Sequence, residues 1–208
     1  WTKKYIDLYN IDLSRYNIDS SLKKYGFYPE DITDVICTHL HFDHAGGNTS
    51  YDQNTVVPTF PNANYWISEK NWTLANHPSQ KDQGSFMKHD WSVLAENGMI
   101  EFVDGRDQFL PNIDIELSYG HTIGMMLPKL NDNSQTLIYM ADLIPMAAHL
   151  PLPWIMSYDI NSALTLEEKR SLLPKAVEEN WTIFFEHDPI HQACKVCYDG
   201  KHFRLKKS

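Results

Sequence analysis

The sequence has few cysteines, few basic residues and no long apolar run. No apolar stretch reaches the ~18 residues of a membrane span, and no leader of the secretory type opens the chain. Lys and Arg number 18 against 27 Asp and Glu, which gives a net charge of −9. A chain that binds a nucleic-acid backbone needs clustered Lys and Arg. We therefore expect neither a membrane nor a nucleic acid as partner.

The three cysteines, Cys37, Cys194 and Cys197, make no disulfide or metal framework. Cys194 and Cys197 resemble half of a zinc knuckle, but no second pair completes it. If their segment is a strand, the two side chains point to opposite faces, which disfavours a disulfide between them. We expect structural thiols in a reducing compartment, and hence a cytoplasmic protein.

Length and composition predict a folded chain without a linker. Hydrophobic residues make up 42% of the 208 residues and aromatic residues 12%, which is enough for a core. No repeat or low-complexity tract divides the sequence, so we expect one domain over residues 1–208. The first residue is Trp1 rather than Met, which suggests a processed or cropped chain.

Strand-like segments alternate with helix-like ones. The strand signals are runs of apolar and β-branched residues bounded by turn residues. They lie at residues 32–38, 62–68, 99–103, 112–119, 125–130, 136–141 and 181–185. The Asp-Gly pair at 199–200 predicts a tight hairpin. This interleaving indicates an α/β protein, with sheet inside and helices outside.

The helix signals are caps and stops around apolar residues at helical spacing. They predict the end of a helix at residues 21–25 before Gly26 and a helix at 69–76 capped by Ser68. A third helix is expected through 86–97, between Ser85 and Gly98. The last is expected at 165–180, with Thr165 and Glu168 as capping box and a bend or break at Pro174.

The segment THLHFDH, residues 38–44, crowds three imidazoles and a carboxylate behind a predicted strand. His39 and His41 are two residues apart, so both rings project to the same side of an extended segment and can reach one ion. Asp43 and His44 follow once the chain has turned, and they can serve a second ion. A structural role rarely needs so many ligand-type side chains together, so this cluster indicates a metal site.

Three further candidates follow other predicted strands. A carboxylate and imidazoles without thiolate suit Zn²⁺, Mn²⁺ or Fe²⁺. One loop supplies too few ligands for two ions, and His121, Asp142 and His187 would complete the set, with Asp142 able to bridge. Taken alone, either histidine could be an ordinary buried polar residue, and Asp142 could be a cap.

The motifs THLHFDHAGG, GHTIG, ADLIP and EHDP, in this order, resemble those of the metallo-β-lactamase superfamily. They are most similar to its branch of acyl-homoserine lactonases and methyl-parathion-hydrolase-like enzymes. The resemblance covers nearly the whole chain, and it is specific for fold and metal site but weakly specific for substrate. It implies an αβ/βα sandwich, two mixed sheets flanked by helices, with metals in the cleft between them.

The resemblance also implies the ligands of two divalent ions, with Zn²⁺ favoured over Mn²⁺ or Fe²⁺. Asp142 and a hydroxide would bridge the pair. One ion would be held by His39, His41 and His121, and the other by Asp43, His44 and His187.

The sequence departs from the family pattern in three places. Members usually carry further N-terminal strands before a segment like residues 1–9, so we expect the first sheet to be incomplete or truncated. The second histidine of the usual GHTxGH is Met125, and it is normally not a ligand. A tyrosine that many lactonases place three residues after the bridging aspartate is Pro145, so help for the oxyanion must come from elsewhere.

The expected chemistry is hydrolysis by a hydroxide that bridges the metals. Two divalent ions sharing a water lower its pKa towards ~7. That hydroxide would attack a carbonyl or phosphoryl centre, with Asp142 as bridge and Asp43 as the group that takes up and returns the proton. No Ser or Cys nucleophile is needed, and the GxSxG elbow is absent.

The segment after Asp142, residues 146–159, is rich in Pro, Trp, Met and Tyr. It is either a core-packing loop or an apolar pocket wall, with His149, Trp154 and Tyr158 offering contacts to a substrate. An apolar wall with few cations suits small molecules with acyl chains or neutral ester groups. An exposed apolar loop near the site would also allow a homodimer.

We therefore expect a dinuclear hydrolase that opens a lactone or cleaves a neutral ester. The alternatives are a phosphotriesterase and a glyoxalase-II-like thioester hydrolase. A nuclease similar to ribonuclease Z is disfavoured by the acidic charge, and a non-catalytic regulator is disfavoured by the complete ligand set.

Overall fold

A computed structural model describes residues 3–12, 14, 17–103, 109–132 and 134–206, so Trp1 lies outside the described part. The strands are β1 (Asp34–Ile36), β2 (Thr49–Asp52), β3 (Thr55–Pro58), β4 (Asn64–Ser68), β5 (Ile100–Val103), β6 (Ile113–Ser118), β7 (Met125–Asp132), β8 (Gln135–Tyr139), β9 (Thr182–Phe184), β10 (Ala193–Tyr198) and β11 (Phe203–Leu205). Every predicted strand segment overlaps one of these strands.

Apart from α6, the helical elements are short. They are α1 (Lys3–Tyr9), α2 (Ile18–Lys23), η1 (Pro29–Asp31), α3 (Phe42–Ala45), α4 (Glu69–Asn76), η2 (Gln83–Ser85), η3 (Lys88–Asp90), α5 (Ser92–Glu96), η4 (Ala141–Leu143), η5 (Ala147–His149) and α6 (Ser162–Glu178). None of the helices in the described ranges is long and apolar enough to cross a membrane.

The N-terminal part of the chain builds a three-stranded parallel sheet in the order β1-β4-β5. Tyr65 lies at its centre, paired with Val35 on one side and Ile100 on the other. Tyr65 and Ile67 are fully buried in a core that also takes up Leu40, Trp91 and residues of α4 and α5. The hairpin of β2 and β3 stands apart from this sheet.

The C-terminal part builds a six-stranded mixed sheet in the order β11-β10-β9-β8-β7-β6. The parallel pair β8 and β9 is connected through α6, as a parallel connection requires. The predicted hairpin at 199–200 joins β10 to β11, and Gly200 takes a φ of +92° there. Helix α6 packs against this sheet, and both contribute to one large core.

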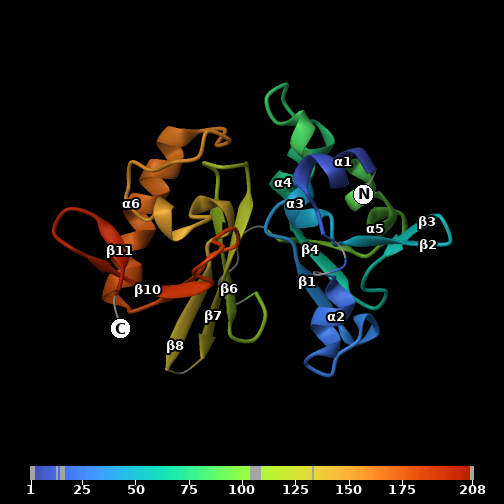
Figure 1. The fold of residues 1–208 in the computed structure, drawn as a ribbon, viewed down its shortest axis with the longest axis horizontal. Coiled ribbons are helices and arrows are strands. Elements are labelled where there is room, and N and C mark those ends of the chain that lie inside the picture. Colours follow the sequence, from blue (N-terminus) through green and yellow to red (C-terminus); the bar gives the residue numbers. More distant parts are fainter. Residues whose placement is uncertain (1–2, 13, 15–16, 104–108, 133, 207–208) are drawn as a thin grey trace.

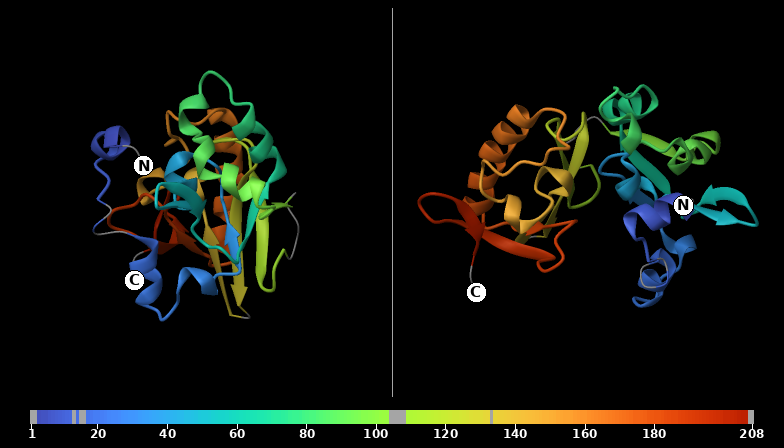
Figure 2. Two further views of the ribbon diagram at one scale, coloured as in Figure 1. Left: turned by 90° about the vertical axis from the view of Figure 1, so that its right-hand side faces the viewer. Right: turned by 45° about the horizontal axis from the view of Figure 1, so that its top comes forward.

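The two sheets meet through β1, β4 and β5 on one side and β6 and β7 on the other (Figure 1). A small core around Val103, Ile115 and Met126 fills the junction. The backbone N–H of Met126 donates to the carbonyl of Thr38 at 2.7 Å, directly before the histidine cluster. The right-hand view of Figure 2 shows the blue-to-green and yellow-to-red parts on either side of this junction. The α/β layers are confirmed, and the junction fixes where the cluster lies.

The helix predicted through 86–97 is wrong for most of its length. Only α5, Ser92–Glu96, is α-helical, and Ser85 belongs to the short turn η2 instead of capping a helix. Phe86 is extended because its backbone pairs with His41 in an antiparallel bridge. Gly98 does follow the helix, with a φ of +66°.

The capping box at Thr165 and Glu168 is also wrong. Helix α6 begins earlier, where the Asn161 side chain accepts from the N–H of Leu164. Thr165 and Glu168 bind groups outside the helix, and Pro174 does not interrupt the helix, which runs on to Glu178.

Ser68 occupies the residue before α4, as predicted, but its side chain makes no capping hydrogen bond.

Gly120 lies where the loop after β6 meets the first turns of α6. A Cβ atom at this position would come within 2.5 Å of the backbone nitrogen of Thr165 and 2.6 Å of its Cα. Real Cβ atoms do not approach a backbone so closely, so only glycine lets α6 pack against this loop. The absence of one methyl group therefore sets the distance between the helix and His121.

We expect Gly120→Ala to lower the free energy of unfolding by about 1–3 kcal/mol, because the overpacked methyl must displace the helix backbone. Urea unfolding of the metal-free protein measures this. Gly84→Ala is the control, since a Cβ there meets nothing within 4 Å. Equal stability of the two variants would show that the contact with α6 is not tight.

Candidate metal centre

The cluster after β1 alternates between the core and the site. Leu40 is fully buried in the N-terminal core, and its N–H donates to Oδ1 of Asn71 at 2.8 Å. His39 and His41, on either side of it, turn to the opposite face, and their ring centroids lie 4.6 Å apart. His41 is the residue before α3, and the helix then carries Asp43 and His44. The predicted common side of the two rings agrees with this geometry.

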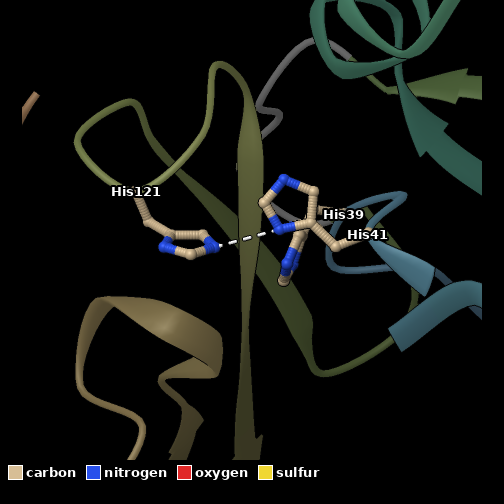
Figure 3. A group of neighbouring side chains, drawn as sticks. All are labelled: His39, His41 and His121. Atoms are coloured by element: carbon tan, nitrogen blue, oxygen red, sulfur yellow. Dashed lines mark hydrogen bonds between the residues drawn. The ribbon is translucent and has the colours of Figure 1, made fainter. Parts of the chain in front are cut away.

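His121 approaches from the other sheet, on the loop after β6. Its Nε2 lies 3.2 Å from Nδ1 of His41, the dashed line in Figure 3. The same Nε2 lies 3.2 Å from Oδ2 of Asp142. One ring nitrogen from each of His39, His41 and His121 falls within 4.8 Å of the others, and all three residues are buried.

A second group lies beside the first. It consists of His44, Asp142, Glu186 and His187, whose ligand atoms lie within 4.8 Å of one another. Nε2 of His44 is 3.3 Å from Nε2 of His187 and 3.4 Å from Oδ2 of Asp142. Oδ1 of Asp142 is 3.2 Å from Nε2 of His187. Asp142 therefore contacts both groups. Its Oδ2 lies near His121 of the first group and His44 of the second, and its Oδ1 lies near His187 of the second.

Asp43 and Glu186 flank His44 at different ring atoms. Oδ2 of Asp43 lies 3.5 Å from Nε2 of His44, and the Asp43 side chain is 43% exposed. Oε2 of Glu186 lies 2.9 Å from Nδ1, on the far side of the ring. Glu186 lies in the EHDP motif, but the sequence predicted no role for it. The only sign of its role in the sequence is that this carboxylate directly precedes a candidate histidine.

Burial and charge separate the protonation states of the histidines. Burial lowers the pKa of His41 to about 3, and burial together with the neighbouring imidazoles lowers the pKa of His39 well below its ordinary value. For His44 burial alone would lower the pKa, but Asp142, Asp43 and Glu186 raise it to about 12. Burial would raise the pKa of Asp142, yet His187 and His44 bring it below its usual range. In the absence of metal, His39 and His41 are neutral at pH 7 and His44 is charged.

The donor atoms fit divalent ions. Nε2 of His39 and Nε2 of His41 are buried and have no hydrogen-bond partner. Such buried polar atoms are rare because each lost partner costs about 1–3 kcal/mol. Neutral imidazole nitrogens and a carboxylate oxygen are ligands that zinc accepts. Each of the two groups could therefore hold one divalent ion.

A cavity of about 1230 Å³ opens onto both groups. Its lining includes His41, Asp43, His121, Asp142 and His187 from the candidate site. Among the described lining residues Lys81 is the only Lys or Arg, and the apolar part includes Phe42, Ile18 and Ile160. The cavity can admit a small molecule to the carboxylate that joins the groups.

The three predicted pocket contacts lie in different places. Tyr158 lines the cavity and is 76% exposed. His149 and Trp154 are not among the lining residues. The Trp154 ring is exposed, while its carbonyl accepts from the buried Nζ of Lys169 at 2.7 Å. Contact with a substrate stays a prediction for all three residues.

The family model for the metallo-beta-lactamase superfamily matches residues 14–187. The chain belongs to this superfamily. An N-acyl homoserine lactonase of Bacillus cereus is 22% identical over 187 residues, which cover 84% of this chain and 64% of that protein. A second, from a Bacillus species, is 24% identical over 179 residues, with the same coverage. The chain thus spans less than two thirds of these relatives' length.

Two solved structures share the fold. A probable metal-dependent hydrolase from Staphylococcus aureus superposes with a TM-score of 0.87 at 24% identity, covering 100% of this chain and 74% of that one. AidC, a dizinc quorum-quenching lactonase in complex with a product, gives 0.77 at 24% identity, covering 92% and 69%. These likenesses confirm the predicted metallo-β-lactamase sandwich of sheets flanked by helices.

The protonation states predict how many protons leave when zinc binds. His44 must lose its proton to become a ligand, whereas His41 is already neutral. We expect His44→Ala to reduce the protons released on saturation with zinc at pH 7 by about one more than His41→Ala does. Calorimetry in buffers of different ionisation enthalpy counts these protons. Equal reductions would contradict the charged state of His44.

Proposed function

We propose that this chain is a dinuclear metal-dependent hydrolase that opens a lactone or cleaves a neutral ester. The position of Asp142 carries the proposal. Its carboxylate lies 3.2 Å from Nε2 of His121 in one group of imidazoles and 3.2 Å from Nε2 of His187 in the other. A buried carboxylate between two groups of nitrogen ligands can bridge a pair of ions that share a water.

We assign seven residues as ligands and one as an outer partner. Glu186 contacts Nδ1 of His44, while Nε2 of that ring faces Asp142, so Glu186 lies outside the ligand shell. Zinc is the proposed metal, a choice supported by the donor set and by the dizinc lactonase among the similar structures. The ligands are His39, His41 and His121 for one ion, Asp43, His44 and His187 for the other, and Asp142 for both.

Bound at these positions, two divalent ions supply a polarised substrate oxygen and a shared water of lowered pKa. The protein's own task is to place a carbonyl against that water and to move one proton. The half-exposed Asp43 carboxylate faces the cavity and can take the proton from the attacking water. It then returns the proton to the ring oxygen as the acyl C–O bond breaks. The product is a hydroxy acid, which ionises at neutral pH.

The cavity supports a small uncharged substrate. One cation among its described lining residues gives little attraction for phosphodiesters, and Phe42, Ile18 and Ile160 offer apolar contact to an acyl chain. The relatives named N-acyl homoserine lactonases support the same class. We further propose a cytoplasmic location, which three free thiols support, and a homodimer stays a prediction.

Proton release during hydrolysis of an acyl-homoserine lactone tests the proposal. The protein is reconstituted with two equivalents of zinc, and one proton should be released for each ring opened. Saturable turnover that a chelator abolishes is the expected result. If protein that demonstrably holds two metal ions gives no turnover, the lactone assignment is wrong, and phosphotriesters and thioesters are assayed next.

Asp142→Ala should abolish turnover and lower the zinc content below two ions per chain, because it removes the carboxylate that, among the described residues, contacts both groups. Zinc is measured by elemental analysis alongside the rate. Asp188→Ala is the matched control, since its half-buried carboxylate lies one residue beyond His187 and accepts hydrogen bonds from backbone N–H groups. Full activity of Asp142→Ala would refute the bridging assignment.

Tyr158→Ala should raise KM several-fold with little change in kcat and with two zinc ions still bound. The ring lines the cavity and is 76% exposed, so it can contact a substrate but supports little of the core. Tyr198→Ala, another exposed tyrosine away from the cavity lining, should leave KM unchanged. An unchanged KM in both variants would exclude Tyr158 from the substrate pocket.

A further inference from the structure

We propose that Asp159 and Thr165 are positioning residues that fix the ring of His121 for metal binding. Neither residue is a candidate ligand, and neither lies in a motif of the metal cluster. The inference rests on the metal site of the proposed function but not on its substrate. It concerns His121, the ligand of the first group that comes from the C-terminal sheet, and what holds its ring in place.

The three side chains form a buried chain of hydrogen bonds. Nδ1 of His121 lies 2.9 Å from Oδ1 of Asp159. Oγ1 of Thr165 donates to Oδ2 of the same carboxylate at 2.7 Å. His121, Asp159 and Thr165 are 2%, 4% and 1% exposed, so water cannot readily replace either partner. Both carboxylate oxygens are therefore committed to protein groups.

The hydrogen bond between His121 and Asp159 decides which ring nitrogen of His121 carries the proton. An ionised carboxylate can only accept a hydrogen bond, so Nδ1 must be the donor. The lone pair is then at Nε2, the atom that lies 3.2 Å from His41 and 3.2 Å from Asp142. A carboxylate on the outer ring nitrogen also makes the metal-facing nitrogen more basic.

Backbone hydrogen bonds around these three side chains hold the segment that carries the His121 ring in place. The N–H of Asn161 donates to the carbonyl of Gly120 at 2.8 Å, and the N–H of Ile160 donates to the carbonyl of His121 at 3.1 Å. Gly120 packs directly on the backbone of Thr165, as described above. The imidazole, the carboxylate and the hydroxyl thus sit on one frame fixed to α6.

The frame also reaches the N-terminal part of the molecule. Nζ of Lys81 donates to the backbone carbonyl of Asp159. Lys81 follows α4, whereas Asp159 precedes α6, so this bond crosses from one part to the other at the edge of the cavity. Asp159 is therefore held at its carbonyl as well as at both carboxylate oxygens.

Zinc affinity of the metal-free protein, measured by competition with a chromophoric chelator, tests the proposal without any substrate. We expect Asp159→Ala to weaken binding of one zinc ion by about 10–100-fold, the usual cost of losing an outer partner of a metal-bound histidine. Thr165→Val removes only the hydroxyl and should weaken the same ion less. Thr165→Ser keeps the hydroxyl and should restore the affinity.

Glu168→Gln is the matched control. Glu168 lies on the same helix and accepts from the N–H of Tyr119 at 2.6 Å and from the hydroxyl of Ser118 at 2.7 Å, but it does not contact the imidazole. We expect this change to lower the thermal midpoint of the metal-free protein while the zinc affinity stays close to that of the unchanged protein. A purely structural role for Asp159 predicts the same pattern for Asp159→Ala.

A second readout is the protonation of the histidine rings in ¹⁵N NMR spectra of the metal-free protein. The unchanged protein should show His121 with its proton on Nδ1, and Asp159→Ala should show a mixture of both ring forms. If Asp159→Ala does not fold, Thr165→Val carries both measurements. Unchanged zinc affinity and an unchanged ring form in folded variants would overturn the proposal.

The outcomes separate this inference from the proposed function. Affected zinc binding in a protein that opens no lactone would leave the positioning role standing and reject the activity. Normal zinc binding in a variant of an active lactonase would do the reverse.

Discussion

The crowding of imidazoles around the buried Asp142 carboxylate is the interaction on which the rest of the site depends. Rings of His39, His44, His121 and His187 each bring a nitrogen within 4.0 Å of this one side chain. An uncompensated carboxylate at this depth would be costly, so the rings and any bound cation stabilise it together. His39, His121 and His187 stand just beyond strands, where the backbone is already fixed by its sheet, and His44 lies on the short helix α3. The two sheets thus hold in place a set of polar groups that would not otherwise assemble.

Helix α6 has a comparable role one layer further out. Three of its residues hold two loops. Glu168 accepts from the N–H groups of Tyr119 and Gly120 in the loop after β6. Thr165 and the buried Lys169 hold the segment before the helix, where Thr165 donates to Asp159 and Nζ of Lys169 donates to the carbonyls of Pro151, Leu152 and Trp154. Burial lowers the pKa of Lys169 to about 8, yet these carbonyls satisfy its protons. The loops that carry His121 and follow Asp142 therefore share one rigid support.

The sequence predicted those features of the site that depend on residues close together in the chain. The two-residue spacing of His39 and His41 places their rings on one side because the segment is extended, and the strand-end positions of His121, Asp142 and His187 follow from the sheet. The pairing of Phe86 with His41, which breaks the predicted helix, depends on a contact between segments far apart in sequence. Thr165 resembles a capping residue in the sequence, but α6 begins at Ser162 and the Thr165 hydroxyl donates to Asp159 instead. Glu186 lies within EHDP and Asp159 lies in no motif, and only the tertiary structure brings these two carboxylates to the rings.

The candidate ligands are divided between the two sheets, and neither sheet carries a full set for either ion. His39, His41 and His44 follow β1, whereas His121, Asp142 and His187 follow strands of the six-stranded sheet. With the proposed ligands, an ion in either group would join the two sheets across the junction, since it would take nitrogen ligands from both. Metal binding and the docking of the two sheets would then stabilise each other.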